Sequence, residues 1–456
     1  MSIAELFAGV IRPDQVCGPG QFSEDYSHDE SLGVTWTTPA AVICPETTDD
    51  VAAVLRIANE HGIAVTARGS GTGLSGSAVP EPDGIVLSFE RMARIVEIDT
   101  LNSIAVVEPG VKLNELDAQL ANVGLAYAVY PGEYSASLGG NVSTNAGGMR
   151  AVKYGVTRNH VLGLEAVLAT GETIRTGGKV TKISSGYDLT QLIIGSEGTL
   201  AVVTEATLKL VPRPAQAVTI LAPFATLDEV TNAVPAIVAS GVGPSMLEYI
   251  DMLTMAAMTH SLDLHLGVSE EIKSTAAAYL VVGLEDTAED RLDQVVGATA
   301  ELLAELGAID IFVLPPGSAA KLIEAREKAF WVGKAAGADD IIDAVIPRAS
   351  IPDFLARIQP LAAANNTWIA GCGHAGDGNV HMAVFQKDPE VRAQVLTELF
   401  ALAMEMGGAI SGEHGIGLEK KSYFLHLEDP AKIDLMRRIK AAFDPNGILN
   451  PGKIFD

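Results

Sequence analysis

Two histidines and a Glu-His pair near the C-terminal end are the residues whose types and spacing are best suited to chemistry. His374 and His381 are the two histidines of the stretch Gly-His-Ala-Gly-Asp-Gly-Asn-Val-His, and Glu413 and His414 follow in Gly-Glu-His-Gly. Imidazole and carboxylate groups bind divalent metals, and an imidazole also serves as a base near neutral pH. The four residues therefore predict a metal site, a catalytic base, or both.

Apolar runs on either side of the first stretch predict two strands that position these histidines. One run ends at Cys372 and the other begins at Met382, and Gly-Asp-Gly-Asn between them is typical of a tight turn. We expect the two imidazoles to lie close together, at the open end of this hairpin. The alternative is that both histidines only stabilise the hairpin through hydrogen bonds. The Glu413-His414 pair favours a site.

A glycine-rich loop in the N-terminal half is suited to binding an anion. Residues 68–76 read Arg-Gly-Ser-Gly-Thr-Gly-Leu-Ser-Gly and match the dinucleotide pattern G-x-G-x-x-G. That pattern needs a helix that begins among the glycines, whereas Ser-Ala-Val-Pro-Glu-Pro-Asp-Gly follows here. We instead expect consecutive backbone N–H groups to form a concavity for a pyrophosphate. An ordinary flexible turn is the alternative.

Two further loops have compositions that suit a flat, polar ligand. Residues 131–148 are dense in glycine, serine, threonine and asparagine, and residues 195–204 read Gly-Ser-Glu-Gly-Thr-Leu-Ala-Val-Val-Thr. Small residues at this density build neither a core nor a charged site, but they allow a ligand to approach the backbone closely. For Glu197 a role in the turn or at the ligand's edge is favoured over catalysis.

The elements that position these loops divide the sequence near Val211–Pro214. Before this point strands predominate, beginning with a strand, a helix capped by Thr47 or Thr48, and a second strand. After it, strands alternate with helices expected at 227–239 and 288–306. That order predicts an antiparallel sheet with helices on one face.

Bulk composition excludes several classes of protein. The 456 residues include 57 acidic and 31 basic ones, a net charge of −26, so a nucleic-acid partner is not expected. No apolar stretch reaches the roughly 18 residues of a membrane span, and the N-terminus does not resemble a signal peptide. Three widely spaced cysteines fit a reducing cytoplasm.

The three loops, in this order, resemble the FAD-binding domain of the vanillyl-alcohol oxidase and p-cresol methylhydroxylase (PCMH) type. The histidine stretches and the ending Phe-Asp-Pro-Asn-Gly-Ile-Leu-Asn-Pro-Gly-Lys are similar to the branch of glycolate oxidase catalytic subunits, D-lactate dehydrogenases and D-2-hydroxyglutarate dehydrogenases. The resemblance extends from about Tyr26 to Lys453.

This resemblance implies an α+β fold, with a two-subdomain PCMH-type FAD-binding domain and a ferredoxin-like C-terminal cap domain for the substrate. The expected parts are an N-terminal segment at 1–34, the FAD-binding domain at 35–214, the cap domain at 215–445, and a segment at 446–456 that returns to the flavin.

The resemblance also implies which residues contact FAD. Family members with covalently bound flavin often have a histidine in the place of Thr72, so noncovalent FAD is expected here. The implied contacts come from the three loops and the chain end: Arg68, Gly69, Ser70, Gly71, Thr72, Gly73, Leu74, Pro131, Gly132, Ser137, Gly140, Thr144, Asn145, Gly147, Glu197, Gly198, Val203 and Asn450.

On the substrate side, the resemblance implies that His374, His381 and Glu413 bind a divalent metal, Zn or Mn, and that His414 is the base. Arg326 is similar to the arginine that binds the substrate carboxylate; a solvated helix charge is the alternative. The chain has Ala383 and Ile341 where D-2-hydroxyglutarate dehydrogenases carry asparagine and lysine. Pro347 and Arg348 resemble the glycolate and lactate enzymes more.

The implied reaction is oxidation of a small D-2-hydroxy acid, D-lactate or glycolate, to the 2-oxo acid. Hydride passes to flavin N5, and electrons continue to a quinone, an electron-transfer flavoprotein or an iron-sulfur subunit. The alternatives are a D-2-hydroxyglutarate dehydrogenase, a non-redox flavoenzyme of the alkyl-dihydroxyacetone-phosphate synthase type, and a flavoprotein subunit that is inactive alone. We expect a cytoplasmic protein, with attachment to the inner face of the membrane and a homodimer both left open.

Overall fold

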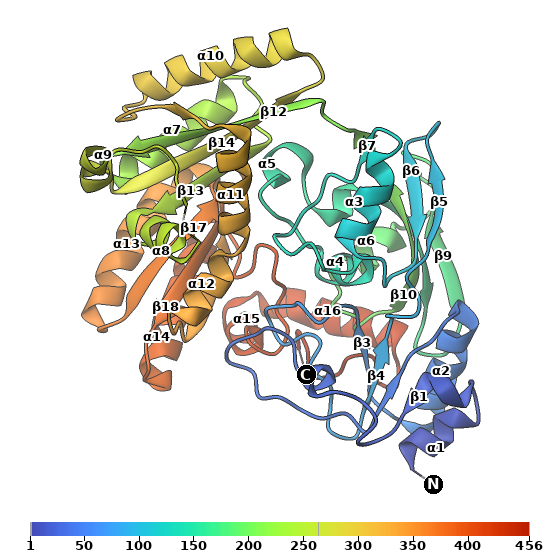
Figure 1. Cartoon of the computed structure of the whole chain (residues 1–456). Coiled ribbons are helices and arrows are strands. Elements are labelled where there is room, and N and C mark those ends of the chain that lie inside the picture. The colour runs from blue at the N-terminus through green and yellow to red at the C-terminus, as the bar shows by residue number, and fades with distance from the viewer. Residues whose placement is uncertain (1, 263, 456) are drawn as a thin grey trace. The chain divides into compact units, whose positions relative to one another are not determined.

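The computed structural model describes residues 2–262 and 264–455, so Met1, Asp263 and Asp456 lie outside the described residues, the first and last of these belonging to the expected terminal segments. Two compact units make up the chain. One contains residues up to Ala146, Val156–Pro212 and residues from Glu413 onward; the other contains Gly147–Gly155 and Arg213–Gly412. Helices and strands occur in both, as expected for an α+β protein (Figure 1).

The first unit begins with a strand, a helix and a strand, as predicted. Helix α2 (Thr48–His61) has Thr47 as its N-cap, in a capping box with Asp50, and ends at Gly62 in the left-handed conformation. Its buried residues include Val51, Val54, Leu55 and Ala58, the stripe that the spacing predicts. This stripe packs in one core cluster with the neighbouring strands.

Among the described residues, three sheets build the first unit. The strand orders are β1-β2-β4-β3, β5-β6-β10-β8-β9 and β11-β7; β2, β4 and β3 are parallel, and the five-stranded sheet is antiparallel. The strands are β1 (Val16–Cys17), β2 (Ala41–Ile43), β3 (Val65–Arg68), β4 (Ile85–Ser88), β5 (Ile95–Asp99), β6 (Ile104–Val107), β7 (Leu125–Ala126), β8 (Val161–Val167), β9 (Thr173–Gly177), β10 (Val202–Lys209) and β11 (Val211–Pro212). The helices besides α2 are α1 (Ile3–Ala8), α3 (Leu113–Ala121), α4 (Leu138–Thr144), α6 (Leu189–Ile193), α15 (Lys421–Leu427) and α16 (Pro430–Phe443).

A seven-stranded antiparallel sheet forms the centre of the second unit, in the order β15-β12-β14-β13-β17-β18-β16. Its strands are β12 (Gln216–Phe224), β13 (Met246–Asp251), β14 (Ala278–Asp286), β15 (Phe312–Val313), β16 (Asp340–Val345), β17 (Trp368–His374) and β18 (Asn379–Phe385). Its helices are α5 (Ala151–Tyr154), α7 (Leu227–Ala239), α8 (Met252–Ser261), α9 (Glu270–Thr275), α10 (Glu289–Glu305), α11 (Pro316–Glu327), α12 (Ala329–Ala335), α13 (Ile351–Ala364) and α14 (Pro389–Glu405).

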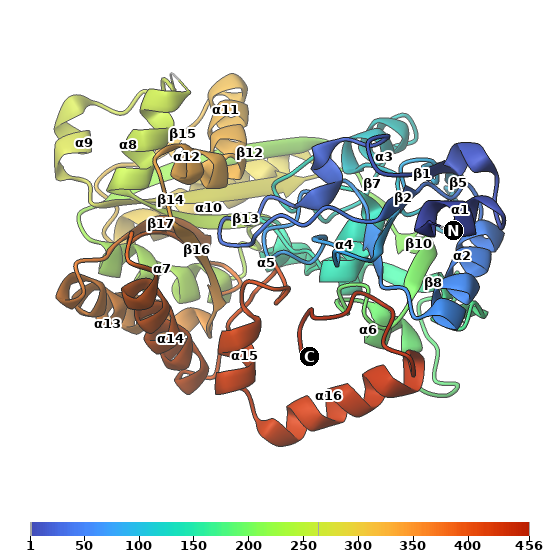
Figure 2. The same cartoon turned by 90° about the horizontal axis from the view of Figure 1, so that it is seen from below.

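Helices cover both faces of this sheet, so the expectation of helices on one face was wrong. Val281 of β14 packs with Met258 of α8 and Leu322 of α11. The alternating residues Leu280 and Val282 are also buried, and α7 and α10 pack on their strand (Figure 2). Because β14 is apolar on both faces, each face needs a helical layer, which a simple alternation pattern does not reveal.

Candidate functional site

The glycine loop of the first unit presents a row of backbone donors. It follows β3 directly, and Gly71 adopts a φ of +73°. Within the described residues, the N–H groups of 69–74 donate to no acceptor of the protein. Several consecutive amides without a protein partner form a cradle suited to an anion such as a pyrophosphate. The loop therefore fits the group that the sequence predicts.

The second loop packs tightly against the first. Ser70 Oγ donates to the Ser135 carbonyl at 2.7 Å, and Ser137 caps α4 by accepting from Gly140 N at 3.3 Å. A Cβ on Gly69 would overlap Ser137 Oγ, so only glycine allows this approach. The structure therefore brings together predicted FAD residues of two loops, Gly69 and Ser70 of the first and Ser137 and Gly140 of the second.

The third loop and the chain end meet at the same place. Glu197 N donates to the Ser143 carbonyl at 2.8 Å, and Asn450 Nδ2 donates to the Glu197 carbonyl at 2.7 Å. Asn450 N also donates to the Val65 carbonyl at 2.8 Å, so the chain end runs beside β3. The structure thus gathers three segments that are distant in sequence around the glycine loop.

The remaining predicted FAD residues do not all lie around the glycine loop. The Arg68 guanidinium donates to the His28 carbonyl at 2.6 Å and lies over the Tyr26 ring, so it is directed toward the N-terminal segment. Gly147 belongs to the second unit. The others lie near the second and third loops: Pro131 and Gly132 before α4, Thr144 and Asn145 at its end, Gly198 beside Asn450, and Val203 on β10.

In the second unit, one face of four adjacent strands carries the polar residues of the substrate-side site. Glu248 lies on β13, His374 on β17, His381 on β18 and Asp343 on β16. Cross-strand pairing aligns Asp343 with His381, and His381 with Cys372, which shares a face with His374. Tyr249 of β13 pairs with Gly373, so Glu248 lies opposite His374, and all four side chains point to the same side of the sheet.

The two histidines are close, as predicted, but at the other end of the hairpin. Their ring centroids are 4.8 Å apart, and their possible ligand nitrogens lie within 4.8 Å of each other. His374 is the last residue of β17, next to the turn, so the expected open end was wrong. The glycines of the motif explain this register: Gly378 has a φ of +96°, and its turn closes directly on His374.

Each histidine has a buried carboxylate on its Nδ1 side. Glu248 is fully buried, and its two oxygens lie 2.8 and 2.9 Å from His374 Nδ1. Asp343 Oδ1 lies 3.9 Å from His381 Nδ1, too far for a hydrogen bond. Asp343 instead accepts from Asn379 Nδ2 at 2.9 Å and Ser411 Oγ at 2.7 Å. With Nδ1 of His374 engaged, Nε2 is the nitrogen suited to a metal.

Arg326 lies beside this pair of groups. It is buried on α11, and its guanidinium forms an ion pair with Glu248 Oε2 at 2.8 Å. A solvated helix charge therefore does not describe it. Its predicted contact with a substrate carboxylate stays a prediction.

Glu413 and His414 follow the point where the chain passes from the second unit to the first. Gly412 N donates to the Asp343 carbonyl at 2.9 Å, within the second unit. In the first unit, the His414 carbonyl accepts from Ser75 Oγ at 2.8 Å, and the Glu197 carboxylate accepts from Ile416 N at 2.7 Å. The Glu197 carboxylate thus fixes the segment after His414. Burial raises the pKa of this carboxyl group.

Sequence reasoning missed several residues that hold this site. The sequence assigned no role to Glu248, Asp343 or Ser411, and it placed Ser75 only within the glycine loop. The available signal was a charge inside an apolar strand, in Met-Leu-Glu-Tyr-Ile-Asp and in Asp-Ile-Ile-Asp-Ala-Val. A charged group at a buried strand position requires a specific partner.

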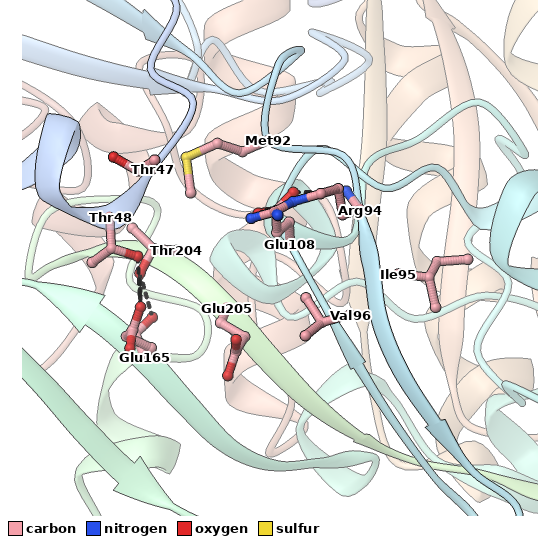
Figure 3. Close-up of a pocket in the computed structure, with 10 residues that line it drawn as sticks. All are labelled: Thr47, Thr48, Met92, Arg94, Ile95, Val96, Glu108, Glu165, Thr204 and Glu205. Atoms are coloured by element: carbon pink, nitrogen blue, oxygen red, sulfur yellow. Dashed lines mark hydrogen bonds and ion pairs between the residues drawn. The ribbon is translucent and has the colours of Figure 1, made fainter. Parts of the chain in front are cut away.

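A separate pocket of about 340 Å³ in the first unit lies away from the predicted residues (Figure 3). Its carboxylates already have partners: Glu108 pairs with Arg94, and Glu165 accepts from Thr48 Oγ1 at 2.6 Å and pairs with Arg175. The pocket is lined by Thr47, Thr48, Met92, Arg94, Ile95, Val96, Glu108, Glu165, Thr204 and Glu205. None of the predicted site residues is among them.

Comparison with known proteins identifies the class to which this fold and site belong. The model for the C-terminal domain of FAD-linked oxidases matches residues 213–454, and the model for an FAD-binding domain matches residues 39–177. The chain therefore belongs to the FAD-linked oxidase family, and it is an FAD-dependent oxidoreductase.

Two relatives and one solved structure are similar to this chain over nearly its whole length. An uncharacterised FAD-linked oxidoreductase of Mycobacterium tuberculosis is 60% identical over 95% of this chain and 94% of its own. A D-lactate dehydrogenase of Anaerostipes hadrus is 37% identical over 97% of this chain and 95% of its own. The structure of p-cresol methylhydroxylase covers 99% of this chain and 96% of its own, with a TM-score of 0.79 at 19% identity, which confirms the predicted fold. None of the described helices combines the length and apolarity needed to cross a bilayer.

Proposed function

We propose that this FAD-dependent oxidoreductase oxidises a small D-2-hydroxy acid, D-lactate or glycolate, with the help of a divalent metal, Zn or Mn. His374, His381 and Glu413 are the proposed metal ligands. The observation that carries the proposal is the pair of imidazoles on one sheet face, with a buried carboxylate hydrogen-bonded to His374. Two imidazoles and a carboxylate suit either metal and leave positions for substrate oxygens.

The residues have separate tasks in this proposal. Arg326 binds the substrate carboxylate and fixes the direction of the Cα–H bond. His414 accepts the hydroxyl proton, a task suited to an imidazole near neutral pH. The bound groups would supply the rest of the chemistry, the flavin as hydride acceptor at N5 and the metal as a Lewis acid at the hydroxyl.

A small substrate is supported by two apolar residues near the histidines. Ile341 and Ala383 are directly paired across β16 and β18, two positions from the Asp343–His381 pair, and so share its face. D-2-hydroxyglutarate dehydrogenases resemble this chain but carry lysine and asparagine at these positions. An apolar pair offers no partner for a second carboxylate, so we infer that D-2-hydroxyglutarate is a poor substrate.

Anaerobic flavin reduction tests the proposal directly. The FAD-loaded protein, with Zn²⁺ or Mn²⁺ added, is mixed with D-lactate, L-lactate, glycolate and D-2-hydroxyglutarate, and flavin absorbance is followed near 450 nm. Rapid bleaching by D-lactate or glycolate alone is expected, and a chelator should abolish it. Bleaching by none of the acids would favour a non-redox flavoenzyme or a subunit that is inactive alone; faster bleaching by D-2-hydroxyglutarate would overturn the small-substrate inference.

The electron acceptor, cellular location and assembly remain proposals from the family resemblance. A quinone, an electron-transfer flavoprotein or an iron-sulfur subunit would reoxidise the flavin in a cytoplasmic enzyme that is either free or attached to the inner membrane face. The reduced protein, mixed separately with a quinone analogue and with each protein acceptor, would identify the fastest oxidant.

A further inference from the structure

Glu248 joins the predicted substrate-binding arginine to the predicted metal ligand His374. We propose that Glu248 is a positioning residue, which fixes His374 for metal binding and at the same time holds Arg326 in place. The inference rests on the proposed function, because it assumes a metal on His374. It concerns three residues of the second unit: Glu248 of β13, Arg326 of α11 and His374 of β17.

The geometry makes Glu248 a shared acceptor. Its Oε2 lies 2.8 Å from the Arg326 guanidinium and 2.9 Å from His374 Nδ1, while Oε1 lies 2.8 Å from the same imidazole nitrogen. The carboxylate has no exposed surface, and Arg326 is only 8% exposed. A buried carboxylate needs a compensating charge, which Arg326 supplies, and the second partner is then held in a fixed direction.

This contact determines which imidazole nitrogen faces a metal. A carboxylate beside Nδ1 favours the tautomer with its proton on Nδ1, so the lone pair is on Nε2. The same contact fixes the ring orientation and increases the basicity of the ligand. Glu248 would therefore fix the tautomer and the ring orientation of His374 in the metal-free protein.

The other histidine provides an internal contrast. Asp343 Oδ1 is 3.9 Å from His381 Nδ1, and the Asp343 oxygens accept instead from Asn379 and Ser411. The described contacts thus place the Glu248 carboxylate directly on His374, whereas the Asp343 carboxylate accepts from the side chains of Asn379 and Ser411. We infer that metal affinity depends more on Glu248 than on the Asp343 side chain.

Arg326 connects the same carboxylate to substrate binding. Its guanidinium is planar with five N–H donors, so one edge can remain on Glu248 while another binds a substrate carboxylate. Loss of Glu248 would then raise the substrate KM as well as weaken metal binding. A purely structural carboxylate would alter stability without this paired effect.

The test measures metal affinity separately from turnover. The FAD-loaded wild type and Glu248→Gln are stripped with a chelator and titrated with Mn²⁺ or Zn²⁺ by calorimetry, and KM for D-lactate is measured in parallel. Loss of a partner of this kind typically weakens metal binding by about 10- to 100-fold, and we expect a loss within that range together with a higher KM. Asp251→Asn is the matched control, because Asp251 is a half-buried acid at the end of the same strand that accepts from Gly371 N at 2.6 Å.

A second variant protects the test against misfolding. Glu248→Met combined with Arg326→Met removes both buried charges together, which folded proteins often tolerate better than removal of one partner. The double variant should still bind FAD and should lose metal affinity to a similar extent.

The possible results separate this inference from the proposed function. Wild-type metal affinity in both variants would overturn the role of Glu248 and leave the metal site intact. Absence of metal binding by the wild type would overturn the metal site itself and, with it, the role of Glu248. An equal loss in Asp251→Asn would also contradict the inference, because it would show a general effect of removing a negative charge from β13.

Discussion

The glycine loop of the first unit and the sheet face of the second unit present different chemical groups. The loop offers backbone N–H groups, and its side chains are small so that a ligand can come close. The sheet face offers charged and imidazole side chains, and hydrogen bonds fix His374 on Glu248 and Asp343 on Asn379. The glycine loop should therefore be sensitive to added side-chain volume, and the sheet face to the loss of charges or hydrogen bonds.

The largest effect is expected from His414→Ala. If His414 is the base, the rate of flavin reduction by D-lactate should fall by roughly 100- to 10,000-fold, because general-base catalysis typically contributes that much. FAD should stay bound, since backbone groups form its loop. Stopped-flow absorbance measures both, with His61→Ala on the exposed end of α2 as the control. An unchanged rate would remove His414 from the mechanism.

Next in size is Gly69→Val, which tests the volume sensitivity of the loop. The new side chain would overlap Ser137 Oγ, so we expect most purified protein to lack FAD, seen as a low ratio of absorbance at 450 nm to that at 280 nm. Gly297→Ala in α10 is the control, because no atom lies within 4 Å of its Cβ position. It should stabilise the protein by up to about 1 kcal/mol. Full FAD occupancy in Gly69→Val would show that the loop is not a close-fitting cradle.

An intermediate effect is expected where a side chain supports the first unit's loops. Glu197→Ala leaves the amides of Ile416 and Gly417 without their acceptor, which should lower the free energy of unfolding by about 3 kcal/mol. Urea unfolding of the FAD-loaded protein measures this. A loss below about 0.5 kcal/mol would mean that the loops are held by backbone contacts alone.

The same carboxylate predicts a dependence on pH. Burial raises the folded-state pKa of Glu197 above its ordinary value of 4.5. At pH values between 4.5 and the folded-state pKa, the folded protein therefore holds a proton that the unfolded chain has lost. This contribution to stability is present at pH values below 4.5 and is lost as pH rises through the folded-state pKa. Relative to Glu197→Gln, the wild type should therefore lose stability as pH rises. Parallel curves for the two proteins in urea unfolding would contradict it.

The smallest effect is expected from Ser411→Ala, on the sheet-face side. It removes the 2.7 Å hydrogen bond to Asp343 but leaves the one from Asn379, so about 1 kcal/mol of stability should be lost. Thermal unfolding measures the change. Metal affinity should fall far less than in Glu248→Gln, and an equal fall would show that the two histidines depend equally on their carboxylates.

Local patterns predicted much of the fold because the relevant interactions are local. The α2 cap at Thr47, its apolar stripe and its end at Gly62 all follow from contacts within a few residues. The same is true of the β17–β18 hairpin and the closeness of His374 and His381. The end of the hairpin at which they meet was predicted wrongly: it is the turn end, because the turn closed by Gly378 directly follows His374.

The partners of the site residues were not predictable in this way. Glu248 is 126 positions from His374 in the sequence, and Glu197 is 219 positions from Ile416. Such pairs form only after a sheet or a domain has assembled, so no spacing in the sequence encodes them. The buried charge inside an apolar strand indicated that a partner exists, but not which residue it is.

The short stretch around Glu413 and His414 has a further consequence for how this chain tolerates change. Ser411 and Gly412 are tied to Asp343 on one side, and Ile416 and Gly417 are tied to Glu197 on the other. Three residues separate the two attachments, and the hydrogen bonds of each attachment stay within one unit. An insertion among the attached residues themselves should therefore cost stability, whereas the exposed stretch at 179–187 offers room for insertions and deletions.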